Sequence, residues 1–355
     1  MTKRYAPALL AAALTAGLAA LAHAAEAPRA LIISTDTATG LANGWRAGVS
    51  DIDDGLAIAM ALAAPELDVR GVVVTWGNNL MEPEVAIAAR VVAGMSANVP
   101  VVRGAPRPLP EVPVTLYDGS AVDDACLNDG VRFMAETLTA SAEPVTIAAI
   151  GPLTDIACMA INFPDAVANI REIVAIGGRD PDEAFVINGV YLSDFNLAND
   201  IPAVRYLLDG TSMPLRFMPF GLTSSVLVPS SERATLCDSG KPLAADFFCP
   251  AIVPWLDQWK KAFAEDGFHP WDQNAIYATI DRDAFDCEPA AYRIVDCTKD
   301  ACAGHNPAQP TRLASETAQL WLTPDPTAKR VSMCKAYADG SGDAFRAAIF
   351  DFAKD

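Results

Sequence analysis

The sequence predicts one α/β domain with a mostly parallel, twisted sheet and helices on both of its faces. Two observations support this fold class. Short runs of β-branched residues alternate with Ala-rich amphipathic runs along most of the chain, as in repeated strand–helix–strand units. Residues 69–75 form a nearly continuous apolar run, broken only by Arg70, which is typical of a strand that is covered on both faces.

The expected elements alternate from the first strand onward. The apolar run 31–35 predicts the first strand, and the stretch that includes residues 58–64 predicts the first helix. Strand 69–75 precedes a helix over 83–93, because Pro83 fits a first helical turn and Gly94 can end the helix. The same pattern predicts strands at 99–103, 145–150, 170–176 and 215–219, and helices at 131–141, 201–208 and 271–280, with one more between Gly151-Pro152 and Ala160. Ligands of such sheets bind beyond the carboxyl ends of the strands.

The first residues are expected to be a signal peptide and not part of the fold. Lys3 and Arg4 precede a small, apolar stretch over residues 6–21, and Ala22-His23-Ala24 offers small residues at a cleavage site. The apolar run is shorter than a membrane span, and Glu26-Ala27-Pro28 follows it. We therefore expect a bacterial Sec-type signal over residues 1–24. The single domain over residues 25–355 would be exported to the periplasm or secreted, with no membrane contact after cleavage.

Charge and cysteine content narrow the classes of function. The formal net charge of −18 argues against a nucleic-acid partner, because phosphates require a basic surface. Eight cysteines without a Cys-x-x-Cys pair favour disulfides over a zinc cluster. Five of them lie from Cys249 to Cys334, among frequent Gly, Pro and Asp, so we expect a disulfide-stapled loop insertion over about 285–335. Cys297 and Cys302 are close enough to pair, and the other pairings stay open.

Several aspartates lie in the connection between the first predicted strand and the first predicted helix. Asp36 closes the strand, and Asp51-Ile52-Asp53-Asp54 directly precedes the apolar helix. Neighbouring carboxylates repel one another, and a hard divalent cation offsets this repulsion. The alternative is a solvated acidic loop whose aspartates cap the helix.

Two later segments carry further polar candidates. Residues 188–200 hold three asparagines and two aspartates, whose amides and carboxylates could bind vicinal hydroxyls of a sugar. The same residue types also form turns, which is the simpler explanation. Trp271-Asp272 opens a predicted helix, where Asp272 could be an N-cap and Trp271 could be core or a surface that stacks on an aromatic ligand.

Several motifs occur in the order of one known family. They are Asp36 with Asp53-Asp54-Gly55, then Gly71 to Asn78, residues 99–109, residues 149–157, residues 172–178, and Asp194-Phe195-Asn196 with Asn188 six residues earlier. Over nearly the whole expected mature length the chain resembles the calcium-dependent nucleoside hydrolases of the inosine–uridine-preferring superfamily. The resemblance implies their Rossmann-like fold and cleavage of the N-glycosidic bond of a small nucleoside substrate.

The resemblance also implies roles for individual residues. Ca²⁺ would be bound by the carboxylates of Asp36, Asp54 and Asp272 and by the backbone carbonyl of Ile150, and Asp36 would also be the catalytic base for the attacking water. The ribose would be bound by Asp53, Asn78, Asn188, Asp194 and Asn196. Oxygen-only ligands suit Ca²⁺ rather than zinc.

Three departures from the family pattern matter. Residues 37–50 are inserted between Asp36 and the aspartate pair, so the two ends of the motif must meet in space, and Asp51 is interpreted as a supporting or capping residue. Asp194 replaces a glutamate of the family and is shorter. Trp271 stands where relatives that prefer inosine and uridine carry a histidine that acts as leaving-group acid. Purine-specific relatives carry a tryptophan there, so Trp271 favours purine nucleosides, with His269 as an alternative acid.

Two other classes remain as alternatives. One is a periplasmic nucleoside- or sugar-binding protein that has lost turnover, although three retained carboxylate ligands argue against it. The other is a phosphotransferase of the haloacid dehalogenase type, whose Asp-x-Asp pattern is broken by Asp36-Thr37-Ala38. The sequence is compatible with a homo-oligomer and does not set the number of subunits.

Overall fold

The computed structural model describes residues 27–43, 48–110, 126–297, 302 and 318–354. The expected signal peptide, residues 1–24, lies outside the described residues. Among the helices that are described, none is both long and apolar enough to cross a membrane.

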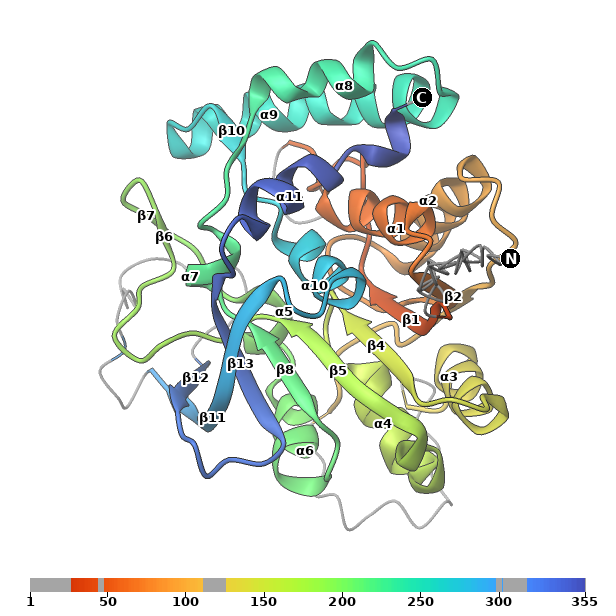
Figure 1. Ribbon diagram of the computed structural model, residues 1–355, viewed down its shortest axis with the longest axis vertical. Helices are drawn as coiled ribbons and strands as arrows, with labels where there is room; N and C mark the ends of the chain where they lie inside the picture. Colours follow the sequence, from red (N-terminus) through yellow and green to blue (C-terminus); the bar gives the residue numbers. More distant parts are fainter. Residues whose placement is uncertain (1–26, 44–47, 111–125, 298–301, 303–317, 355) are drawn as a thin grey trace, which may run out of the picture.

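The centre of the fold is a nine-stranded sheet with the strand order β12-β11-β13-β8-β5-β4-β1-β2-β3 (Figure 1). Its strands are β1 (Arg29–Thr35), β2 (Leu67–Val74), β3 (Val101–Arg103), β4 (Val145–Ala149), β5 (Ile170–Ile176), β8 (Leu215–Met218), β11 (Phe285–Asp296), β12 (Ala318–Pro324) and β13 (Val331–Tyr337). All neighbours from β3 to β13 pair in parallel, and β11 pairs antiparallel with both β13 and β12. Two small ladders join β6 (Val186–Ile187) to β7 (Val190–Tyr191) and β9 (Val228–Pro229) to β10 (Gly267–Phe268).

Helices cover both faces of this sheet. Residues of β1 alternate between two core clusters, with Leu31 and Ile33 in one and Ala30 and Ile32 in the other. The first cluster contains apolar side chains of α1 (Asp53–Ala63), α2 (Met81–Gly94), α9 (Cys249–Phe263), α10 (Trp271–Ile280) and α11 (Ser341–Ala348). The second contains those of α3 (Asp129–Ala140), α4 (Thr154–Asn162) and α6 (Ile201–Gly210). In Figure 1, α9 and the short α8 (Ala234–Cys237) form an outer layer beyond α1 and α11.

Shorter helical segments lie in the connections. They are α5 (Phe195–Ala198), α7 (Phe220–Thr223), the 3₁₀ turns Pro164–Asn169, Ser230–Arg233 and Asp351–Ala353, and the π-helix Leu243–Phe248. α7 follows β8 directly, and Figure 1 shows both α5 and α7 near the carboxyl ends of the parallel strands.

The predicted fold class is confirmed. Every strand and helix that the hydrophobic pattern predicts is present, with ends shifted by a few residues; the helix expected around 58–64, for example, begins at Asp53. The expected loop insertion over 285–335 needs correction, because most of its described residues form β11, β12 and the start of β13, which extend the main sheet. Its disulfides are present: Cys287–Cys334 joins paired residues of β11 and β13, and Cys297 is bonded to Cys302.

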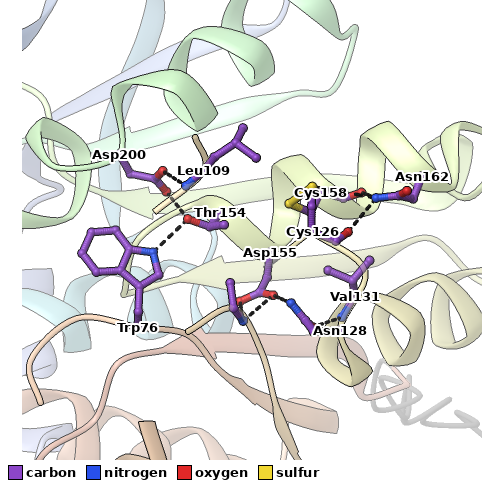
Figure 2. Close-up of a disulfide and its surroundings, with 11 residues drawn as sticks. Trp76, Leu109, Cys126, Asn128, Val131, Thr154, Asp155, Cys158, Asn162 and Asp200 are labelled. Atoms are coloured by element: carbon purple, nitrogen blue, oxygen red, sulfur yellow. Dashed lines mark hydrogen bonds between the residues drawn. A yellow bond between two sulfur atoms is a disulfide. The ribbon is translucent and has the colours of Figure 1, made fainter. Parts of the chain in front are cut away.

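All eight cysteines are in disulfides, which confirms that prediction. Cys237–Cys249 joins α8 to the start of α9. Cys126–Cys158 fixes the segment before α3 to α4, and the Asn162 amide donates to the backbone carbonyls of both cysteines (Figure 2).

Candidate metal centre and substrate cavity

The predicted site lies where the strand order reverses. From β1 the chain continues to β2 and β3 on one side, whereas β4 and β5 lie on the other side. Such a switch point opens a crevice beyond the carboxyl ends of the strands. A cavity of about 110 Å³ occupies this position. It is lined by Asp36, Asp51, Asp53, Asp54, Asn78, Ile150, Ile176, Gly177, Phe185, Ser193, Asp194, Phe195, Asn196, Phe220, Thr223, Trp271 and Asp272.

Three elements bring the buried aspartates to this cavity. Asp36 directly follows β1, Asp53 and Asp54 form the first turn of α1, and Asp272 lies in the first turn of α10. A helix N-terminus carries partial positive charge, which favours a carboxylate in its first turn. α1 and α10 pack side by side, and the Gln273 amide donates to the carbonyl of Asp53 at 2.8 Å, so the two helix N-termini face the same space.

Asn78 joins the two halves of the split motif. Its backbone N–H donates to Asp36 Oδ2 at 3.0 Å, and its side-chain amide donates to Asp51 at 3.1 Å and to Asp54 at 3.2 Å. The other oxygen of Asp54 accepts from the Thr35 hydroxyl at 2.5 Å and from the Asp36 N–H at 3.3 Å. The two ends of the motif therefore meet, as the metal hypothesis requires.

Gly77 makes this close approach feasible. A Cβ atom at this position would lie 1.9 Å from Asp36 Oδ2. Any larger residue would push the turn after β2 away from Asp36, and Asn78 would lose its contact with the carboxylate.

The inserted residues 37–50 fold back on themselves without separating the motif ends. Ala42 and Val49 form an isolated antiparallel bridge, and the Ser50 N–H donates to the Leu41 carbonyl at 2.9 Å. Asn79 donates to the Ala42 carbonyl at 2.7 Å, which fixes the insertion to the turn after β2. Residues 44–47, at the centre of the insertion, lie outside the described residues.

The buried carboxylates carry strongly raised pKa values. Burial is the largest cause for Asp36, Asp53, Asp54 and Asp272, and negative neighbours add to it. The pKa of Asp54 rises to about 7, with Asp51 as its main repelling neighbour. Glu84 of α2 is also buried, and desolvation raises its pKa to about 9.

These charges fit a divalent cation. None of the four buried aspartates forms an ion pair with a lysine or arginine within the described ranges. Carboxylate oxygens of Asp51, Asp53 and Asp54 lie within 4.8 Å of one another. Oxygen donors at this spacing are the ligands of a hard cation. A bound divalent ion would therefore supply the missing positive charge.

The sugar-binding candidates divide into two groups. Asp194, Asn196 and Asn78 line the cavity, and the Asn196 amide donates to the Ile150 carbonyl at 2.8 Å. Asp194 is the N-cap of α5, where it accepts from the N–H groups of Leu197 at 3.3 Å and of Gly178 at 2.7 Å.

Asn188 is not brought to the cavity, contrary to expectation. It is exposed in the turn between β6 and β7, and its amide donates to the Phe263 carbonyl at 3.0 Å. Its φ of 47° and that of 84° at Gly189 are typical of a two-residue hairpin turn, which Asn-Gly favours. Turn formation, the simpler explanation for this segment, therefore accounts for Asn188.

One wall of the cavity is aromatic. Trp271 lines it together with Phe185 and Phe220, and the indole N–H of Trp271 donates to the Ser224 hydroxyl at 2.9 Å. Phe185 meets Trp271 edge-on, with centroids 6.0 Å apart and planes at 82°. His269 does not line the cavity, and its ring nitrogens face the Val226 carbonyl at 2.9 Å and Glu265 at 3.2 Å.

Sequence reasoning missed several residues of this site. Phe185, Phe220, Thr223 and Ser193 line the cavity although no motif marked them, and Asp51 faces it although it was interpreted as a supporting residue. Asp51 carried a usable signal, because it stands two residues before Asp53. The two phenylalanines carried none, since single aromatic residues are also common in cores.

The edge strand β12 supports the loop after β5. Arg179 forms a parallel bridge with Trp321 of β12. Its N–H donates to the Leu320 carbonyl at 3.1 Å, and its carbonyl accepts from the Leu322 N–H at 2.8 Å. The neighbouring Gly177 lines the cavity, so the C-terminal strands hold part of its wall.

A buried polar network lies behind the cavity (Figure 2). The Trp76 indole N–H donates to the Thr154 hydroxyl at 2.9 Å, and that hydroxyl donates to Asp200 at 2.8 Å. Asp155 accepts from the Ala105 N–H at 2.9 Å and from the Asn128 amide at 2.8 Å. The network fixes the connection after β3 to α4 and α6. Trp76 also packs 6.2 Å from Phe195, which lines the cavity.

Comparison with known proteins shows similarity to one family along most of the chain. A family model described as inosine-uridine preferring nucleoside hydrolase matches residues 32–335. A non-specific ribonucleoside hydrolase RihC of Klebsiella pneumoniae is 31% identical over 214 residues, which cover 55% of this chain and 68% of that protein. A pyrimidine-specific ribonucleoside hydrolase RihA of Escherichia fergusonii is 34% identical over 215 residues, with the same two coverages, 55% and 68%.

Solved structures share the fold. A purine-preferring ribonucleoside hydrolase from Gardnerella vaginalis has a TM-score of 0.67 at 19% identity, covering 92% of this chain and 99% of that one. An inosine-uridine preferring nucleoside hydrolase from Bacillus anthracis has a TM-score of 0.61 at 16% identity, with coverages of 92% and 99%.

We expect the metal-free protein to lose stability as pH rises from 5 to 8. The folded carboxyl of Asp54 keeps its proton up to about pH 7, whereas an unfolded aspartate releases it near its ordinary pKa. The folded state therefore binds more protons in this window, and its free energy of unfolding falls with pH, by on the order of 3 kcal/mol for Asp54 alone. Thermal unfolding in chelator measures this slope.

The control is Asp54→Asn, whose amide has no proton to lose, so the slope of the chelated variant should be shallower. A divalent ion binds the deprotonated carboxylates, and its stabilising effect should increase with pH. A chelated wild-type protein that is as stable at pH 8 as at pH 5 would contradict the prediction.

Proposed function

The chain belongs to the inosine-uridine preferring nucleoside hydrolase family, and from this premise we propose that it is an exported, calcium-dependent hydrolase of purine ribonucleosides. N-ribosyl hydrolysis follows from its relatives, which are ribonucleoside hydrolases. The metal, the preferred base and the cellular location are proposals, each supported by different residues. The observation that carries the proposal is the gathering of Asp36, Asp53, Asp54 and Asp272 in one cavity.

Calcium is the metal that the donors favour. The family is metal-dependent, and the residues around this cavity offer carboxylate and carbonyl oxygens. Asp36, Asp54, Asp272 and the Ile150 carbonyl would hold the ion. Ca²⁺ accepts six to eight oxygen ligands in flexible geometry, whereas Mg²⁺ demands near-ideal octahedral geometry, so ligands from several separate elements suit Ca²⁺ better. A bound ion would lower the pKa of a water and so make it a better nucleophile.

Different side chains of the cavity would have different roles in hydrolysis. Asp36 accepts the proton of the water that attacks the anomeric carbon, while the Asn78 N–H fixes one of its oxygens. The C–N bond to the base breaks as the new C–O bond forms, and the sugar gains oxocarbenium character. Carboxylates around the cavity stabilise that positive charge. Asp53, Asp194 and Asn196 line the same space and would orient the ribose hydroxyls.

The aromatic wall supports a purine as the leaving group. The Trp271 ring is held by the bond from its N–H to Ser224 and by the edge of Phe185. A flat, fixed indole offers a stacking surface that matches the larger area of a purine better than that of a pyrimidine. Stacking also helps the purine leave in protonated form.

Export is supported by the chain's cysteines and its first residues. All eight cysteines are in disulfides, which persist in oxidising compartments such as the periplasm. The basic and apolar residues 1–24 have the composition of a signal peptide.

The first test measures the dependence of turnover on calcium and on Asp36. Protein with Ca²⁺ should release reducing sugar from inosine without added phosphate, and chelator should abolish this release. Asp36→Asn should lower kcat by at least about 100-fold, because the variant lacks the proton acceptor. Asp257→Asn, at an exposed position of α9, is the matched control and should keep wild-type turnover. Near-normal activity of Asp36→Asn would contradict the mechanism.

The second test compares substrates in variants of Trp271. Trp271→Ala should lower kcat/KM for inosine and guanosine by about tenfold relative to uridine, because a lost base–aromatic stacking contact costs about 1–3 kcal/mol. Trp271→Phe retains an aromatic face and should recover part of the difference. Equal losses for purine and pyrimidine nucleosides would remove the argument for a purine.

The third test locates the mature protein. Expression of the full chain in a Gram-negative host should yield a periplasmic form whose N-terminal sequence begins at Ala25. A cytoplasmic protein that keeps Met1 would contradict the proposed export.

A further inference from the structure

The inserted segment, residues 37–50 between Asp36 and Asp51, is anchored by its last residues to the outer layer of the fold. The Val49 N–H donates to Gln258 Oε1 at 2.9 Å, and Gln258 Nε2 donates to the Val49 carbonyl at 3.0 Å. One side chain of α9 thus satisfies both backbone groups of Val49, in the manner of a neighbouring β-strand.

Gly48 allows this contact because it has no side chain. Its φ of +121° lies in a region that favours glycine, and a Cβ atom there would lie 1.7 Å from Gln258 Oε1. Conformation and space both require glycine at this position. The contact between the inserted segment and α9 is therefore a built feature of the fold.

The anchored residue lies two positions before Asp51. Between them, Ser50 is buried, its N–H donates to the Leu41 carbonyl, and its hydroxyl accepts from the Asn79 amide at 3.5 Å. These contacts leave Asp51 little freedom. Its carboxylate meets the Asn78 amide and lies within 4.8 Å of carboxylate oxygens of Asp53 and Asp54.

The charge of Asp51 also affects the pKa values of its neighbours in the site. Among charged neighbours it contributes most to raising the pKa of Asp53 and of Asp54. A carboxylate so close to two others would weaken the apo fold and strengthen attraction for a cation. The amide of Asn78 offsets part of this cost, and a bound ion would offset more of it.

We propose that the inserted segment adds Asp51 to the metal site as a further carboxylate ligand, and that Gln258 is the positioning residue that holds Asp51 in place. The inference rests on the proposed function in one respect, namely that a divalent ion binds among Asp36, Asp54 and Asp272. An additional carboxylate raises affinity for Ca²⁺, whose binding strength depends on ligand charge and on rigidity of the site.

Calorimetric titration of the metal-free protein with Ca²⁺ tests the ligand. Asp51→Asn should weaken Ca²⁺ binding by about tenfold or more, whereas Asp246→Asn, at an exposed position, should leave it unchanged. The asparagine retains an oxygen that can accept from Asn78. If Asp51 merely positions Asn78, Asp51→Asn will therefore bind Ca²⁺ as wild type does and only Asp51→Ala will be impaired, which would overturn the proposal.

A double-mutant cycle tests the positioning residue. Gln258→Ala should weaken Ca²⁺ binding severalfold, and the double variant Asp51→Asn/Gln258→Ala should bind no more weakly than Asp51→Asn alone, because Gln258 acts through Asp51. Independent, additive losses would overturn that role. Thermal unfolding of the chelated variants verifies that each is folded before titration.

The same titration separates this inference from the proposed function. Wild-type protein that binds Ca²⁺ and cleaves inosine, together with unimpaired Asp51→Asn, would overturn only the role of Asp51. Wild-type protein that does not bind Ca²⁺ would overturn both the metal site and this inference.

Discussion

Mutual repulsion among buried aspartates is the constraint on which the rest of the site depends. Asp36, Asp53, Asp54 and Asp272 are each at most 6% exposed, and burial together with their neighbours raises the pKa of all four. The fold keeps them together by means that need no basic side chain: two helix N-termini, the Thr35 hydroxyl and the Asn78 amide. These groups hold the four carboxylates around one cavity, which is the arrangement that a bound cation would need.

Much of this arrangement could be predicted from the sequence, because it follows from strand periodicity. The carboxyl ends of parallel strands meet at one edge, so Asp36, Asn78 and Ile150 were expected near one another and line one cavity. Asn188 could not be placed in this way, since Asn-Gly between two short extended runs satisfies hairpin geometry as well as it matches a motif. Local turn chemistry determined its position.

The C-terminal region shows a different limit of sequence reasoning. Gly, Pro and charged residues in 285–335 obscured β11 and β12, which pair antiparallel at the end of the sheet. Strands at such a position need apolar residues on fewer sides than the central strands, so they lack the continuous apolar run that marked residues 69–75. The aromatic wall could not be predicted either, because only tertiary packing brings Phe185 against Trp271 and Phe220 against Phe185.

The bridge between Arg179 and Trp321 affects the order in which parts of the site can form during synthesis. During synthesis, Asp36 and Asp54 emerge early, whereas Asp272 and β12 emerge much later. Contacts between residues so distant in sequence form slowly, because a long stretch of chain must first be closed into a loop. A nascent or truncated chain that lacks β12 leaves the Gly177 wall unsupported. The wall at Gly177 is therefore completed only after β12 has been synthesised and has paired with Arg179.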